Sequence, residues 1–128
     1  MRLLLDTHTV LWFSTNDPQL SSPANSAILD SNNEKWVSPI SFWEIAIKVS
    51  VGKYVLTAPY EVFWHNAIDA NGFLILAILP RHGSFLTSMP FHHRDPFDRM
   101  LAAQAQSDGL TLVSCDPIFD RYGILRLW

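Results

Sequence analysis

The chain has 128 residues, of which 48% are hydrophobic and 16% are charged. This composition can supply a core and excludes an intrinsically disordered chain, and the length predicts one domain over residues 1–128. The formal net charge of −3 weighs against a strongly basic nucleic-acid binder, so a polyanion would have to be held by a local basic patch or a bound cation.

The first half of the chain alternates short apolar runs with signals that start helices. Twice a serine, which caps helices well, precedes a proline, which is favoured in the first helical turn. In chain order we expect a buried strand at 2–5, a short helix from Thr7 or His8 to Phe13, a helix at 23–31, a weak strand at 35–37, and a helix from 39 to about 51 that Gly52 closes.

The second half continues this alternation. Its clearest helix begins at Asp95-Pro96 and ends before Gly109, since aspartate caps helix starts and glycine suits the residue after a helix end. The expected elements are a helix at 59–70, a strand at 73–77, a short helix at 80–87, the helix at 96–108, a strand at 110–114, a short helix at 117–121 and a strand at 124–127. Such alternation predicts an α/β fold, in which a parallel sheet is covered by helices and ligands lie beyond the carboxyl ends of strands.

The single cysteine, Cys115, excludes an internal disulfide framework and is compatible with a reducing compartment. No apolar run approaches the roughly 20 residues needed to span a bilayer. The first residues place Asp6 directly after three leucines, which does not resemble a signal peptide. We therefore expect a soluble, cytoplasmic protein.

Five of the 12 acids occur in apolar or helix-capping contexts, namely Asp6, Glu44, Asp95, Asp98 and Asp116. Asp6 and Asp116 both fall just past the end of a predicted strand, and each has an alternative role as a helix cap. Asp95 is expected to cap the helix that Pro96 begins. Asp98 lies in the first turn of that helix, where its charge would interact favourably, but only modestly, with the helix dipole. Glu44 sits beside the apolar face of its predicted helix, and its alternative is an ion pair with Lys48 one turn later.

Together these acids suggest a shared site. Two like charges about 4 Å apart repel each other by about 4 kcal/mol at an effective dielectric constant of about 20, so such a cluster is tolerable when a divalent cation occupies it. Oxygen ligands alone favour Mg²⁺ or Mn²⁺. An ion of this kind can orient water, lower its pKa and stabilise charge on a phosphodiester.

Five segments of the chain resemble PIN-domain proteins and, among them, the VapC-type toxins of bacterial toxin–antitoxin pairs. In order, these segments are Leu4–His8, Ser41–Lys48 with Gly52-Lys53, Asp95–Ala105, Leu112–Asp116 and Tyr122–Trp128, so the resemblance runs nearly end to end. It implies a PIN-like three-layer α/β/α fold with a central parallel five-stranded sheet of strand order 3-2-1-4-5.

The resemblance also implies an endoribonuclease that uses one or two Mg²⁺ or Mn²⁺ ions per site. Such an enzyme hydrolyses RNA through metal-activated water and leaves 5′-phosphate and 3′-hydroxyl ends. The matching catalytic acids are Asp6, Glu44, Asp98 and Asp116, with Asp6, Asp98 and Asp116 as metal ligands and Thr7, Asp95 and Ser114 in support. We prefer Asp98 to Asp95 as the third acid because Asp98 directly precedes the apolar stretch 100–105.

The resemblance further implies a homodimer and a cognate VapB-type antitoxin. Trp12, Trp43 and Trp64 are candidate contacts, because aromatic anchors are enriched at interfaces, although core packing is the expected role of at least one of them. The low basicity departs from a typical RNA binder. The nearest basic cluster is Arg81, His82, His92, His93, Arg94 and Arg99, whose members either contact RNA phosphates or pair with acids and face solvent.

Three alternatives remain at this point. One is a zinc enzyme with His92, His93 and Asp95 as ligands, which is disfavoured because adjacent histidines rarely point at one ion and no His-Glu-x-x-His motif is present. Another is a metal-dependent phosphatase, although the segment after Asp6 lacks the second acid expected of an aspartyl-phosphate enzyme. The third is a PIN-fold binding module without turnover.

Overall fold

A computed structural model describes residues 1–128 and contains one sheet of five parallel strands in the order β3-β2-β1-β4-β5. The strands are β1 (Arg2–Leu5), β2 (Glu34–Val37), β3 (Leu74–Ile75), β4 (Thr111–Val113) and β5 (Arg126–Leu127). The expected α/β class, the parallel sheet and the strand order are therefore confirmed.

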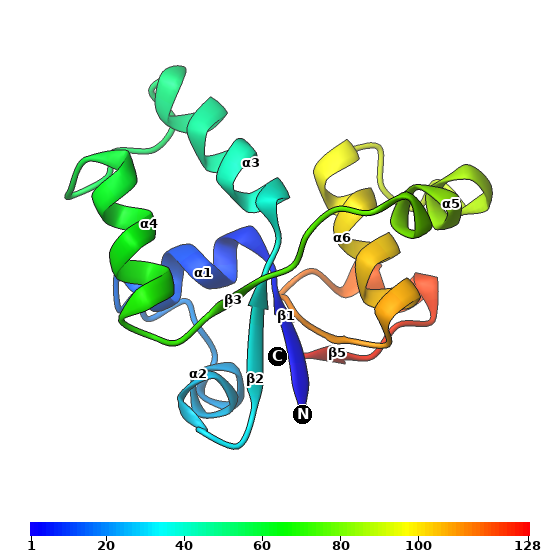
Figure 1. The fold of residues 1–128 in the computed structure, drawn as a ribbon, viewed down its shortest axis with the longest axis horizontal. Coiled ribbons are helices and arrows are strands. Elements are labelled where there is room, and N and C mark those ends of the chain that lie inside the picture. The colour runs from blue at the N-terminus through cyan, green and yellow to red at the C-terminus, as the bar shows by residue number, and fades with distance from the viewer.

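Helices cover both faces of this sheet (Figure 1). They are α1 (Thr7–Ser14), α2 (Ser22–Leu29), α3 (Pro39–Ser50), α4 (Tyr60–Asp69), α5 (Pro80–Ser88), α6 (Pro96–Asp108) and the 3₁₀ helix η1 (Pro117–Tyr122). Helix α6 begins at an Asp95 cap and ends at Gly109 in a left-handed conformation (φ 63°), which glycine adopts at no steric cost.

The central strand β1 divides the core in two, because successive side chains of a strand point to opposite faces of the sheet. Leu3 and Leu5 pack in the core cluster that includes residues of α1, α2 and α4, whereas Leu4 packs in the cluster built from α6 and η1. All three leucines are completely buried. The apolar run before Asp6 therefore holds one strand between two helical layers.

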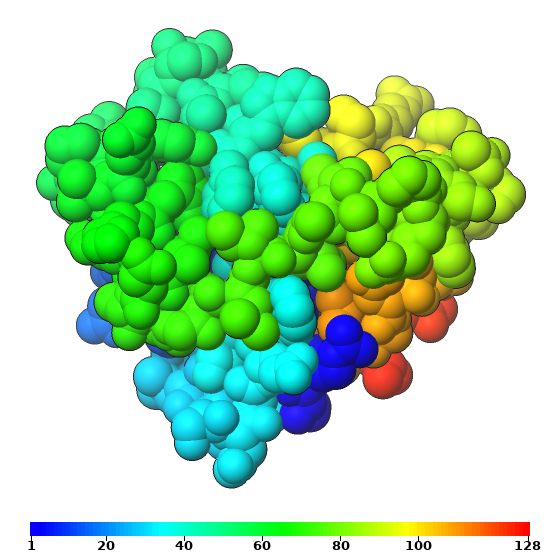
Figure 2. Space-filling view, viewed as in Figure 1, coloured from blue at the N-terminus to red at the C-terminus, as the bar shows by residue number.

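The edge strand β3 is shorter than expected, with two residues rather than the predicted run 73–77. Leu74 and Ile75 pair only with β2, as residues of an edge strand do, and both residues are exposed. The segment that carries β3 runs across the surface from α4 towards α5 (Figures 1 and 2). None of the helices is both long enough and apolar enough to cross a membrane.

The register of the central strands positions the polar residues that follow them. Leu5 of β1 pairs with Val37 of β2 on one side and Val113 of β4 on the other, so the three strands end level with one another. The next residues, which include Asp6 after β1 and Ser114 after β4, therefore meet at one edge of the sheet.

Candidate active site

Asp6 connects the end of β1 to the start of α1. Its Oδ1 accepts a hydrogen bond from the His8 backbone N–H at 2.8 Å and so caps α1, while Oδ2 accepts from the Ser114 hydroxyl. Asp6 is only 5% exposed, and burial raises the pKa of its carboxyl above the usual value, with the Glu44 charge acting in the same direction. Asp6 thus caps a helix with one oxygen and joins a buried polar group with the other.

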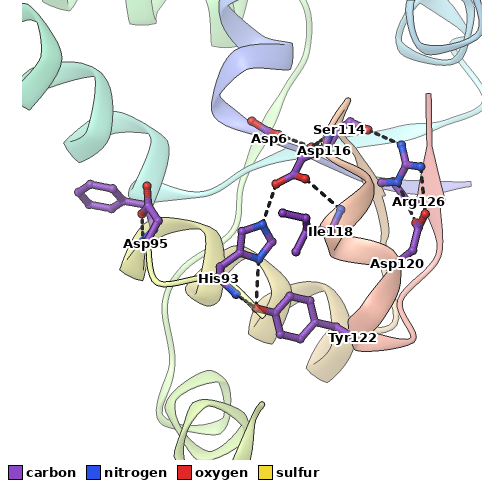
Figure 3. A network of polar contacts seen from close by, with 10 residues as sticks. Asp6, His93, Asp95, Ser114, Asp116, Ile118, Asp120, Tyr122 and Arg126 are labelled. Atoms are coloured by element: carbon purple, nitrogen blue, oxygen red, sulfur yellow. Dashed lines mark hydrogen bonds and ion pairs between the residues drawn. The ribbon is translucent and has the colours of Figure 1, made fainter. Parts of the chain in front are cut away.

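Asp116 lies three residues after β4 and caps the helix that follows it, as Asp6 does after β1. Its Oδ1 accepts from the Ile118 backbone N–H at 2.9 Å and caps η1, while Oδ2 lies 2.7 Å from Nε2 of His93 (Figure 3). The Asp116 backbone N–H donates to the Ser114 hydroxyl oxygen at 3.2 Å. Since the same hydroxyl donates to Asp6, Ser114 links the two strand ends.

Glu44 reaches this group from α3. The Thr7 hydroxyl donates to its Oε1 at 2.8 Å, and the Lys48 ammonium donates to its Oε2 at 2.7 Å. The ion pair with Lys48 is therefore present, but Glu44 is only 5% exposed and lies in the interior beside Asp6 rather than at the helix edge. Ser41 lies 2.9 Å from the Thr7 hydroxyl and completes this buried set.

Asp98 faces the other acids from the first turn of α6. Burial raises the pKa of its carboxyl to about 7, and the charges of Asp95, Asp6 and Glu44 add to that rise while His93 opposes it. Ligand atoms of His93, Asp98 and Asp116 all lie within 4.8 Å of one another. The structure therefore brings together all four acids that the sequence indicated as catalytic.

This group has few cationic partners. Lys48 pairs with Glu44 and His93 contacts Asp116, but no lysine, arginine or histidine forms an ion pair with Asp6 or Asp98. Crowded carboxylates without counter-charges have a high affinity for a hard divalent cation, which prefers oxygen ligands. The donor set at this edge of the sheet therefore fits Mg²⁺ or Mn²⁺.

Asp95 caps the N-terminus of α6. It is exposed, and its side chain accepts from the Phe97 backbone N–H at 2.8 Å. Its charge nevertheless raises the pKa of Asp98. The structure does not assemble the zinc site of the alternative, because the possible metal ligands that lie together are His93, Asp98 and Asp116, while His92 packs edge-on against the Tyr122 ring with 4.8 Å between centroids.

Arg81 and His82 are engaged at the far end of α6. Arg81 donates to both carboxylate oxygens of Asp108 at 2.9 and 3.1 Å, and His82 lies 3.1 Å from the same group. Arg81 holds the pKa of the Asp108 carboxyl well below its usual range. Because Asp108 is the last residue of α6 and Asp98 lies in its first turn, the structure does not bring these two basic residues to the acids.

Arg99 is buried and fastens the loop before α6 to the helix. Its guanidinium donates to the backbone carbonyls of Pro90 at 2.8 Å and Met89 at 3.2 Å, and the Phe91 ring covers it with 3.8 Å between the guanidinium carbon and the centroid. The Arg99 guanidinium is therefore engaged in hydrogen bonds within the protein. Arg94 is exposed, and its side chain forms no hydrogen bond or ion pair within the protein.

Replacing Arg99 with methionine is expected to lower the free energy of unfolding by about 2 kcal/mol, because buried carbonyls lose a charged donor. Urea denaturation of the metal-free protein measures this change. Arg94→Met is the matched control and should stay within about 0.5 kcal/mol of the wild type, as exposed substitutions usually do. Equal losses in both variants would contradict a structural role that is special to Arg99.

The three tryptophans have different environments. Trp64 is 7% exposed and belongs to the core, whereas Trp43 is 61% exposed and meets Phe97 edge-on with 5.2 Å between centroids. Trp12 is half-buried between His8 and Trp128.

The sequence did not indicate Ser41 and Tyr122 as parts of the site, because a lone serine and a lone tyrosine carry no signal of a partner that is distant along the chain.

The fold and this acidic centre together define an α/β protein with carboxylates gathered beyond its strand ends. The chain belongs to the PIN domain family, whose model matches residues 3–125. None of the curated proteins is detectably similar to it in sequence.

Solved structures with the same fold include VapBC2 from Rickettsia felis bound to a promoter DNA fragment, with a TM-score of 0.75 and 16% identity over 99% of this chain and 98% of that one. DNA-bound VapBC from Salmonella typhimurium has a TM-score of 0.69 and 19% identity over 100% and 97%. VapBC-1 from nontypeable Haemophilus influenzae has a TM-score of 0.65 and 17% identity over 99% and 97%. At these identities the likeness establishes the shared fold.

Proposed function

We propose that this protein is a Mg²⁺- or Mn²⁺-dependent endoribonuclease and the toxin of a VapBC-type toxin–antitoxin pair, acting in the cytoplasm. The observation that carries this proposal is the convergence of Asp6, Glu44, Asp98 and Asp116 with a single lysine among them. Membership of the PIN domain family and the fold shared with VapBC complexes support it.

In this mechanism Asp6, Asp98 and Asp116 would hold one or two divalent ions through their carboxylate oxygens. When bound, such ions supply a water molecule of lowered pKa and polarise the scissile phosphate. Glu44 completes the oxygen donors or accepts a proton from the attacking water at Oε1, where the Thr7 hydroxyl fixes the orientation of the carboxylate. No side chain forms a covalent intermediate, and Ser114 acts only by holding Asp6.

RNA binding relies on the cation more than on basic side chains. Arg81, His82, His93 and Arg99 are all engaged within the protein, so within the basic cluster that the sequence indicated, Arg94 and the half-buried His92 are left as candidates to meet a phosphate. With a net charge of −3, the metal-free protein repels RNA at long range. RNA affinity should therefore depend strongly on the divalent ion.

We also propose that the protein binds a VapB-type antitoxin and forms a homodimer with a second copy of the chain. Trp43 is the candidate aromatic contact for the antitoxin, because it is exposed and packs on Phe97, one residue before Asp98. A partner that covers this surface would lie over the entrance to the acidic group. Trp64 is excluded from such a role in the folded protein by its burial.

The test is RNA cleavage by the purified chain after removal of metal. Mn²⁺ or Mg²⁺ should restore cleavage that EDTA abolishes, and sequencing of the product ends should find 5′-phosphates and 3′-hydroxyls. Tight RNA binding without turnover under these conditions would favour a binding module instead. Hydrolysis of a small phosphomonoester but not of RNA would favour a phosphatase, and activity restored by zinc alone would favour a zinc enzyme.

A further inference from the structure

A chain of polar contacts leads from the buried Tyr122 through the buried His93 to Asp116 (Figure 3). The Tyr122 hydroxyl lies 3.0 Å from Nδ1 of His93, and Nε2 of the same ring lies 2.7 Å from Oδ2 of Asp116. His93 is only 7% exposed and Tyr122 6%, so solvent hardly reaches either residue. Neither group is used by the mechanism described above.

The orientation of the His93 ring is fixed by packing. The ring stacks on the Tyr122 ring with 5.6 Å between centroids and 7° between planes. It also packs against the Phe119 ring, with 4.5 Å between the two centroids. The backbone N–H of His93 donates to the Tyr122 hydroxyl oxygen at 2.9 Å, which ties the main chain to the same residue. The ring therefore has one position from which to contact Asp116.

The contacts also decide which ring nitrogen carries hydrogen. The Tyr122 oxygen already accepts from the His93 backbone N–H, and its single hydrogen is free to be donated to Nδ1. Nε2 then carries the hydrogen that the Asp116 carboxylate accepts. The opposite tautomer would point the Nε2 lone pair at a carboxylate oxygen, which is electrostatically unfavourable.

We propose that His93 is a positioning residue that holds Asp116 for the cation and does not itself bind the cation. This assignment rests on the proposed metal-dependent function. The lone pair that a metal would need at Nε2 is replaced by an N–H directed at Asp116, even though this nitrogen lies close to ligand atoms of both Asp98 and Asp116. The cation is then held by oxygen atoms alone.

Asp116 gains a defined orientation from two donors. Ile118 donates its backbone N–H to Oδ1 and His93 donates to Oδ2, so each oxygen keeps a lone pair that can face a cation. Hydrogen bonds that orient a ligating carboxylate typically change metal affinity by about 10- to 100-fold when they are removed. Tyr122 contributes indirectly, because it fixes the tautomer and the plane of the imidazole.

Mn²⁺ binding to the metal-free full-length protein tests this assignment, with titration calorimetry or the free Mn²⁺ electron paramagnetic resonance signal as the readout. His93→Ala should weaken Mn²⁺ binding by about 10- to 100-fold. His93→Gln should recover part of this loss, because an amide N–H can donate to Asp116. Tyr122→Phe, which removes only the hydroxyl, should weaken binding by a smaller factor.

His92→Ala is the matched control, since it removes a neighbouring imidazole that packs on the same Tyr122 ring but has no contact with a carboxylate. Its Mn²⁺ affinity should equal that of the wild type. Thermal unfolding in EDTA shows whether each variant is folded. If His93→Ala does not fold, Tyr122→Phe decides the question, and wild-type Mn²⁺ affinity in that variant would overturn the assignment.

Electron spin echo spectroscopy of the Mn²⁺-loaded wild type separates positioning from direct ligation. We expect no modulation from a directly bound nitrogen, and a nitrogen signal that disappears in His93→Ala would overturn the proposal. Mn²⁺ affinity in His93→Ala equal to that of the wild type would also overturn it while leaving the nuclease function intact. Failure of the wild type itself to bind Mn²⁺ would instead remove the metal-dependent function, and this assignment with it.

Discussion

Asp98→Asn is expected to lower the rate of Mn²⁺-dependent RNA cleavage by about 100-fold or more, since it removes a charged ligand worth several kcal/mol in the transition state. The same substitution should make the metal-free protein more stable at pH 8. Asparagine has the shape of aspartate but lacks the negative charge that burial and the Asp95 charge disfavour at this position. Cleavage assays with Mn²⁺ and urea denaturation in EDTA measure the two effects.

The pH dependence of the metal-free protein follows from the same carboxyl. Burial raises the pKa of Asp98 from its usual 3.8 to about 7 in the folded state, so the folded protein binds a proton that the unfolded chain releases. The resulting stability is fully present below the usual pKa and is lost as the pH rises through the folded value. The free energy of unfolding should therefore fall between about pH 4 and pH 7 more steeply in the wild type than in Asp98→Asn.

Glu61→Gln is the control for both measurements, because it removes one exposed negative charge on α4. It should preserve the cleavage rate and the pH dependence of the wild type. Full cleavage activity in Asp98→Asn would show that Asp98 is not part of the catalytic group. Parallel pH profiles in Asp98→Asn and the wild type would show that another group causes the loss of stability.

Lys48→Met should lower the free energy of unfolding by about 3 kcal/mol, because it leaves the Glu44 carboxylate buried without its cation. The pair is short, at 2.7 Å, and the Glu44 side chain is only 6% exposed. Although partial burial acts to lower the pKa of Lys48, its hydrogen bond to Glu44 and the Glu44 charge raise that pKa above its usual value. Urea denaturation of the metal-free protein at neutral pH measures the loss.

A double-mutant cycle with Glu44→Gln isolates the interaction between these two residues. The double variant should be more stable than Lys48→Met alone, because the unpaired buried charge is then absent. Lys53→Met, which removes an exposed lysine from the following loop, should leave stability nearly unchanged. Additive losses in the double variant would contradict the pairing.

The acids after β1 and β4 could be predicted because one rule covers both: parallel strands place their carboxyl ends at one edge of the sheet. From the sequence, capping and site function were alternative roles for Asp6 and Asp116. The structure shows that each carboxylate caps a helix with one oxygen. The other oxygen stays available for Ser114 or His93. Capping therefore helps to orient these acids in the site.

The roles of the basic residues could not be predicted, since they depend on where each side chain points. Asp98 and Arg99 are adjacent, yet neighbours on a helix point about 100° apart. Asp98 faces the acids, and Arg99 faces the carbonyls of the loop before α6. The contact between His93 and Tyr122 spans 29 positions and has no local pattern to mark it.

The hydroxyl of Ser114 joins a carboxylate from the beginning of the chain to a backbone N–H near its end. During synthesis, residue 6 leaves the ribosome long before residue 116 has been added. A growing polypeptide therefore lacks part of this acidic group until residue 116 has been added and has left the ribosome, so the proposed nuclease would stay inactive beside the RNA of its own ribosome up to that point.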